Sequence, residues 1–152
     1  MIKKLLIFLV LNFIALAIAG LFTGSGVSSD WYQELNKAPW TPPGWVFGAA
    51  WTFIMVAFSL FMAFWWGVAE RKKGVAILFG IQWVLNVSWS PIFFYAQQVI
   101  LGLFVITSLT VLVGYLFFWN WKKLRVNTLF ILPYLIWLII ATSLNTYILF
   151  NN

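Results

Sequence analysis

Long apolar runs separated by short polar breaks form the main pattern along this chain. Five such runs can be followed, over residues 5–22, 44–68, 74–95, 99–119 and 128–150. Each is roughly 18 to 25 residues long, the length that an α-helix needs to cross a hydrocarbon core of about 30 Å. Spanning strands would need only about 10 residues and would alternate in polarity. The pattern therefore predicts an all-α membrane protein, a single domain over residues 1–152 built as a five-transmembrane-helix bundle.

Composition supports a lipid environment for these runs. Hydrophobic residues make up 64% of the chain and charged residues 8%, whereas a soluble domain is about 25% charged. A chain of 152 residues cannot hide so much apolar surface in one core, so the bilayer must solvate the remainder.

The basic residues divide unequally between the two ends of the predicted bundle. One end carries Lys37 alone, in an external loop at 23–43 that also holds Asp30 and Glu34. The other end carries the remaining eight, namely Lys3, Lys4, Arg71, Lys72, Lys73, Lys122, Lys123 and Arg125. By the positive-inside rule the N-terminus is expected in the cytoplasm and the C-terminus outside. Topology thus accounts for the net charge of +6, and no nucleic-acid partner is expected.

A second interpretation of the first apolar run stays open. The pair Lys3-Lys4 followed by an apolar stretch is also the pattern of a cleaved signal peptide, and the other four helices would then keep the same orientation. The run is longer than the usual signal core of about 7 to 15 residues. We expect it to be retained. The lack of an Arg- and Ser-rich leader favours a bacterial cytoplasmic membrane over an organelle.

The chemistry that is missing narrows the function classes. The chain has no histidine and no cysteine, and no ionisable residue other than tyrosine lies well inside an apolar run. Histidine is the commonest metal ligand and general base, and ion-coupled transporters keep ionisable groups at membrane depth. We therefore expect no metal site, no required cofactor, and no catalytic residue of the acid–base or nucleophilic kind.

Aromatic and amide side chains recur instead on three helix faces at helical spacing. The faces are Gly48, Trp51 (or Thr52), Met55 and Ser59; Gln82, Asn86, Trp89 and Phe93; and Tyr134, Trp137, Ala141 and Asn145. Such residues can simply pack helices together. They can also form stacking walls and hydrogen-bonding groups for a flat, mostly apolar ligand.

The external loop is rich in proline and tryptophan. Its residues Trp31, Tyr32, Pro39, Trp40, Pro42 and Pro43 make it stiff and give it apolar surface to bury. A lid over the bundle mouth and a membrane-interface anchor both fit this composition. Pro91 is expected to kink the third helix near its end, whereas Pro133 falls near the start of the fifth.

Four segments of the chain together resemble the translocator protein (TspO/MBR) family, which includes tryptophan-rich sensory proteins and the peripheral benzodiazepine receptor. They are Trp31-Tyr32-x-x-Leu35-x-Lys37-x-Pro39-Trp40-x-Pro42-Pro43-Gly44, Trp51, Asn86-x-x-Trp89-Ser90-Pro91-x-Phe93-Phe94, and Pro133-Tyr134-x-x-Trp137-x-x-x-Ala141-x-x-Leu144-Asn145. The resemblance spans essentially the whole chain.

The resemblance implies a five-helix bundle in the lipid membrane, commonly a homodimer, with a ligand cavity that opens toward the first loop. It implies a receptor or sensor for porphyrins such as protoporphyrin IX. Together with the helix faces it gives a ligand-binding set of Tyr32, Trp51, Gln82, Asn86, Trp89, Phe93, Trp137 and Ala141, under a loop lid of Trp31, Pro39, Trp40, Pro42 and Pro43.

Two alternatives follow from the same resemblance. One is light- and oxygen-dependent porphyrin degradation involving Trp51 and Trp137; the other is transport of tetrapyrroles or lipids. Sterol binding is not expected, because no basic residue follows Tyr147, which a sterol-recognition pattern would require. Haem iron is usually held by His, Cys, Met or Tyr. A chain without the first two favours a metal-free porphyrin as its ligand.

Overall fold

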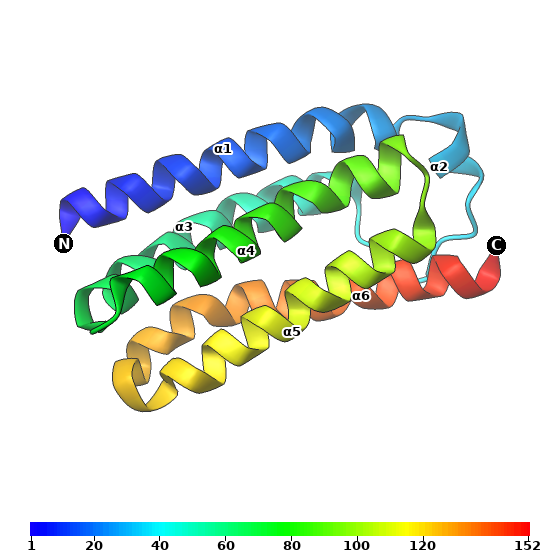
Figure 1. Cartoon of the computed structure of the whole chain (residues 1–152). Helices are drawn as coiled ribbons and strands as arrows, with labels where there is room; N and C mark the ends of the chain where they lie inside the picture. The colour runs from blue at the N-terminus through cyan, green and yellow to red at the C-terminus, as the bar shows by residue number, and fades with distance from the viewer.

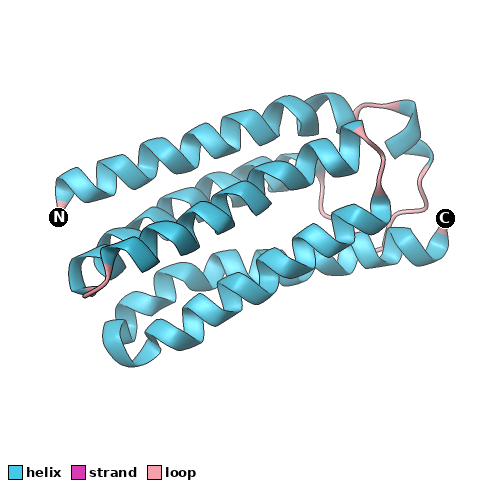
Figure 2. Cartoon of the chain, viewed as in Figure 1, coloured by secondary structure: helices cyan, strands magenta, loops and turns pink.

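Helices make up almost all of the protein in the computed structural model, which describes residues 1–152 (Figures 1 and 2). The elements are α1 (Ile2–Val27), α2 (Asp30–Glu34), α3 (Gly44–Val68), α4 (Lys72–Ser90), the π-helical turn η1 (Pro91–Tyr95), α5 (Val99–Leu124), the 3-10 helix η2 (Arg125–Ile131) and α6 (Leu132–Asn151). There is no strand. The prediction of an all-α protein is confirmed.

Four segments are long and apolar enough to cross a membrane. They are Ile2–Val27, Gly44–Val68, Lys72–Tyr95 and Val99–Asn151. The last has 53 residues and includes both α5 and α6, which fold back on one another around η2 (Figure 1). A hydrogen bond of 3.0 Å between the hydroxyls of Thr110 and Thr142 joins these two helices.

Helix α1 extends to Val27, beyond the expected end at Phe22. The last turns contain Thr23 and Ser25, whose hydroxyls donate to the carbonyls of the preceding turn, to Ala19 at 3.0 Å and to Leu21 at 3.1 Å. These side chains therefore satisfy their polar groups inside the helix. The polar composition of the segment had suggested a loop, but the helix continues through it.

At Pro91 the regular α-helical hydrogen bonding of α4 ends. Proline has no N–H to donate, and the chain continues as the π-helical turn η1, in which the amide of Ala96 donates to the carbonyl of Pro91 at 2.9 Å. A π-turn inserts an extra residue and shifts the direction of the side chains. Phe93 and Phe94 consequently both point into the protein and are buried.

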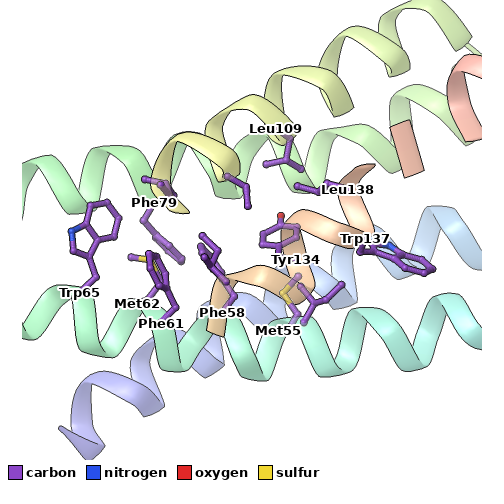
Figure 3. Packing of buried hydrophobic residues seen from close by; sticks show 14 of the residues in the cluster. Met55, Phe58, Phe61, Met62, Trp65, Phe79, Leu109, Tyr134, Trp137 and Leu138 are labelled. Carbon is purple, nitrogen blue, oxygen red and sulfur yellow. The ribbon is translucent and has the colours of Figure 1, made fainter. Parts of the chain in front are cut away.

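The two ends of the bundle differ in character. The N-terminus, the α3–α4 connection and the α5–α6 connection share one end, and the first loop, the α4–α5 connection and the C-terminus share the other (Figure 1). A dense hydrophobic core fills the first of these halves and extends as far as the cavity residue Leu109 (Figure 3). Phe58, Phe61, Met62 and Leu138 are completely enclosed there. The half beside the first loop is where the bundle is hollow.

Candidate functional site

A cavity of about 330 Å³ lies between the helices at the loop end of the bundle. Its wall is formed by α1, α3, α4, η1, α5, α6 and the first loop, and most of it is apolar. Small-molecule sites typically have volumes of about 300–1,000 Å³ and combine apolar walls with a few polar groups. Size and lining therefore fit a small hydrophobic ligand.

Three aromatic rings form flat surfaces in this wall. Trp51 projects from α3, and Trp89 and Phe93 project from α4 and η1. The rings of Trp89 and Phe93 are stacked, with centroids 5.0 Å apart and planes at 13°. The Trp89 indole N–H also donates to Asn145 Oδ1 at 3.2 Å, which fixes the orientation of the ring. The Trp89 ring is thus held in a fixed orientation at the cavity wall.

Among the buried polar side chains of the wall, Asn86 differs from the others. Ser90 shares a hydrogen bond of 3.0 Å with Thr23. Asn145 accepts from Trp89 and donates to the Val99 carbonyl at 3.1 Å. Asn86 is only 7% exposed and lines the cavity, yet its amide makes no hydrogen bond within the chain. Its amide atoms are not among the fully enclosed polar atoms that lack a partner, so they reach the cavity and leave a donor and an acceptor free for a molecule there.

The first loop covers the cavity through aromatic contacts made by α2. Ser29 caps this short helix by accepting from the Tyr32 amide at 3.3 Å. Tyr32 lines the cavity, and its ring packs edge-on against Phe94 with centroids 5.3 Å apart. Trp31 packs in the same way on Phe93, at 5.6 Å. Burial raises the pKa of the Tyr32 phenol above its usual 10.0.

A single cation stabilises the turn that follows α2. Lys37 Nζ donates to the carbonyls of Tyr32 at 2.7 Å and Gln33 at 3.1 Å, and it lies 4.8 Å above the Tyr32 ring. A lysine at the C-terminal end of a helix satisfies the last carbonyls. Lys37 lines the cavity mouth, but its ammonium group already has partners in the loop.

The second half of the loop is tied to α6. Trp40 Nε1 donates to Ser143 Oγ at 3.2 Å, and the Trp40 ring packs edge-on against Tyr147. The backbone of Asn36 makes two hydrogen bonds to the side chain of Asn152, at 2.8 and 3.3 Å. Contacts on two sides of the mouth therefore hold the loop closed.

The structure brings together six of the eight residues expected to bind a ligand. The six that line the cavity are Tyr32, Trp51, Asn86, Trp89, Phe93 and Ala141. Of the expected loop lid, Pro42 lines the cavity and Trp31 packs on the cavity residue Phe93. Trp40 lies outside the cavity against Tyr147, and Pro39 and Pro43 do not line the cavity.

The other two expected residues lie outside the cavity wall. Gln82 is one turn deeper than Asn86 on α4, and its side-chain amide donates to the Tyr134 hydroxyl at 2.8 Å. Trp137 packs edge-on against Phe47, with centroids 5.4 Å apart, and it is Phe47 that lines the cavity. Trp137 supports the wall from behind.

Several wall residues were absent from the expected ligand-binding set. Among them, Asn145 lies on the polar-aromatic face of α6, so its spacing was the available signal. Gly48 likewise lies on the predicted face of α3 that contains Trp51, whereas Phe47, Gly20 and Gly44 belong to none of the three predicted faces. Only the folded arrangement shows that these residues reach the cavity.

Comparison with known proteins gives a consistent result over nearly the whole chain. The TspO/MBR family model matches residues 7–150. The tryptophan-rich sensory protein of Cereibacter sphaeroides is 34% identical over 143 residues, with 90% of this chain and 87% of the relative covered. Protein CrtK of Rhodobacter capsulatus is 32% identical over 139 residues, with 88% and 85% covered. The human translocator protein is 32% identical over 136 residues, with 83% and 79% covered.

Proposed function

This chain belongs to the TspO/MBR family, and we propose that it is an integral membrane receptor or sensor whose cavity binds porphyrins resembling protoporphyrin IX and related flat hydrophobic ligands. Two relatives are named tryptophan-rich sensory protein and translocator protein. Both names are compatible with a membrane protein that recognises a small molecule. The apolar helices support the membrane location.

The proposed receptor crosses a bacterial cytoplasmic membrane five times, with α1, α3, α4, α5 and α6 as the spans. As one straight helix, the 53-residue segment Val99–Asn151 would be about 80 Å long at 1.5 Å per residue, far more than a bilayer of about 30 Å needs. Two crossings joined at η2 fit the bilayer. Eight of the nine basic residues lie at the end that holds the N-terminus, which supports a cytoplasmic N-terminus and an external C-terminus. We also propose a homodimer as the assembly.

The observation that supports the ligand class best is the unpaired Asn86 amide between aromatic walls. A metal-free porphyrin such as protoporphyrin IX offers a broad π-surface and two propionate carboxylates at its rim. Trp51 and Trp89 supply surfaces for the ring. The Asn86 amide N–H groups can donate to one of these carboxylates. The proposed complex thus satisfies a polar group that the protein alone leaves unpaired.

The test is a titration of protoporphyrin IX into the purified protein, followed by quenching of tryptophan fluorescence. We expect saturable quenching, and weaker binding in the variant Asn86→Ala. Loss of a hydrogen bond to a buried amide costs about 1–2 kcal/mol, which corresponds to roughly a 5- to 30-fold higher Kd.

The matched control is Asn120→Ala, which removes another buried asparagine. Asn120 lies near the end of α5, where its side chain donates to the Leu116 carbonyl at 2.9 Å, away from the cavity. Its replacement is expected to leave the Kd of the porphyrin unchanged. Equal losses in both variants, or no saturable quenching by the parent protein, would contradict the proposed function.

A further inference from the structure

The helices α1 and α3 are in contact at mid-depth, and nearer the loop end both contribute residues to the cavity wall. At mid-depth Asn12 Nδ2 of α1 donates to Ser59 Oγ of α3 at 2.8 Å. Nearer the loop, α1 is bound to α4 through the hydrogen bond between Thr23 and Ser90. In the same region α3 packs on α6, where Phe47 meets Trp137. Near the loop the two helices thus have different partners, and Gly20 of α1 and Gly44 and Gly48 of α3 border the cavity along a seam between the helices.

Glycines line this seam on both sides and face open space. Gly20 of α1 and Gly44 and Gly48 of α3 line the cavity and are exposed, and a Cβ atom built on any of them would have no neighbour within 4 Å. The opposite side of the cavity is tightly packed. A Cβ on Gly102 of α5 would come within 3.2 Å of Phe93. The cavity is thus closed toward α5 and open between α1 and α3.

From this geometry we infer that the seam between α1 and α3 is a lateral portal through which a membrane-dissolved, planar hydrophobic ligand reaches the cavity directly from the bilayer. The inference rests on the proposed function in taking the cavity as the binding site. The unpaired Asn86 amide, 7% exposed, lines the cavity behind the seam and is a polar group that a ligand entering there would meet.

The surroundings of the seam fit a lipid-facing opening. Leu21 beside the seam on α1 and Phe53 on α3 are large apolar residues, 75% and 63% exposed. Such side chains belong in the hydrocarbon region, so the portal would face acyl chains. The route through the loop is obstructed by its ties to α6, including the bond from Trp40 to Ser143. A hydrophobic ligand is also concentrated in the bilayer rather than in the water above the loop.

Labelling of a single thiol inside the cavity tests this route without any porphyrin. The chain has no cysteine, so the variant Asn86→Cys places one reactive group behind the seam. The protein would be reconstituted in lipid vesicles and treated with N-(1-pyrenyl)maleimide, a planar hydrophobic reagent that dissolves in the bilayer and becomes fluorescent when it reacts. The observed rate reports arrival of the reagent in the cavity.

Narrowing the seam should slow this reaction. Adding Gly48→Leu to Asn86→Cys is expected to lower the labelling rate by about tenfold or more, within the range over which mutations alter association rates. Gly20→Leu, which narrows the seam from the α1 side, should act in the same direction, and Gly48→Ala should have a smaller effect. The matched control is Gly67→Leu, on α3 but outside the cavity, where a Cβ also has open space. It should leave the rate unchanged.

A variant with a loosened first loop distinguishes entry through the seam from entry through the loop. Trp40→Ala removes a tie between the loop and α6, and it should leave the labelling rate unchanged if the portal is used. The inference would be overturned by faster labelling in Trp40→Ala together with no effect of Gly48→Leu and Gly20→Leu. It would also be overturned if the thiol in the parent background were not labelled from the membrane. The labelling experiment uses no porphyrin, so it tests the portal alone. Failure of the proposed function is detected instead by the quenching titration with protoporphyrin IX.

Discussion

The variant Gly26→Ala tests how α1 is packed against η1. A Cβ atom on Gly26 would lie 2.4 Å from Cβ and Cγ of Phe94, whereas carbon atoms pack at about 3.5–4.0 Å. The atoms that clash include the root of the Phe94 side chain, so a rotation of the ring cannot relieve the contact. Either η1 or the end of α1 must move.

The magnitude follows from comparison with Gly24→Ala. Gly24 also lies in the last turns of α1, and a Cβ there would have no neighbour within 4 Å. Neither glycine has a positive φ angle, so alanine is compatible with the backbone at both positions and gains up to about 1 kcal/mol of helix propensity. Overpacking costs about 1–3 kcal/mol. The difference between the two variants isolates that cost.

The assay is unfolding of the detergent-solubilised protein by denaturant, followed by circular dichroism. Gly24→Ala should be as stable as the parent or more stable, and Gly26→Ala should be less stable than Gly24→Ala by about 1–3 kcal/mol. Phe94 also packs on Tyr32, so protoporphyrin IX should dissociate faster from Gly26→Ala. Equal stability of the two variants would refute this account of the α1–η1 contact.

Two further predictions concern Gln82 and Tyr32. Tyr134→Phe should lower the free energy of unfolding by about 1–3 kcal/mol, because it leaves the buried Gln82 amide without its partner. The double variant Gln82→Met/Tyr134→Phe should be about as stable as the parent, because both polar groups are gone. Denaturant unfolding of the parent and the two variants measures this, and equal destabilisation of both variants would contradict it. Burial raises the pKa of Tyr32 above 10.0, so the stability contributed by its neutral phenol is present below pH 10 and is lost as the pH rises through the raised pKa. The parent should therefore lose more stability above pH 10 than Tyr32→Phe, and the difference between their tyrosinate absorbance titrations should have its midpoint above 10.0.

The sequence predicted the faces of the helices better than the depth of each residue. Helical spacing placed Gln82 and Asn86 on one face, and both are buried. Residues one turn apart are separated by about 5 Å along the axis, which decides whether a side chain meets the cavity or the core. Gln82 meets Tyr134, and Asn86 meets open space. Periodicity carries no information on that choice.

The hydrophobic pattern of the sequence also could not predict which distant segments of the chain are in contact. Phe47 stands between Trp137 and the cavity because α3 leans on α6. The loop residue Trp40 finds its partner in Ser143, 103 positions away. Such pairs depend on how the helices cross, and crossing angles follow from side-chain packing along entire helices. The composition of the loop indicated that it has apolar surface to bury, but not against which helix.

An experimentally determined structure of the protein with bound protoporphyrin IX tests the central claim most directly. The account predicts the macrocycle in the cavity beside Trp51 and Trp89, with a carboxylate oxygen of the porphyrin about 3 Å from the side-chain nitrogen of Asn86. It would be contradicted by an empty cavity with the porphyrin bound elsewhere, such as in the shallow groove on α6 formed by Trp40, Thr146 and Tyr147.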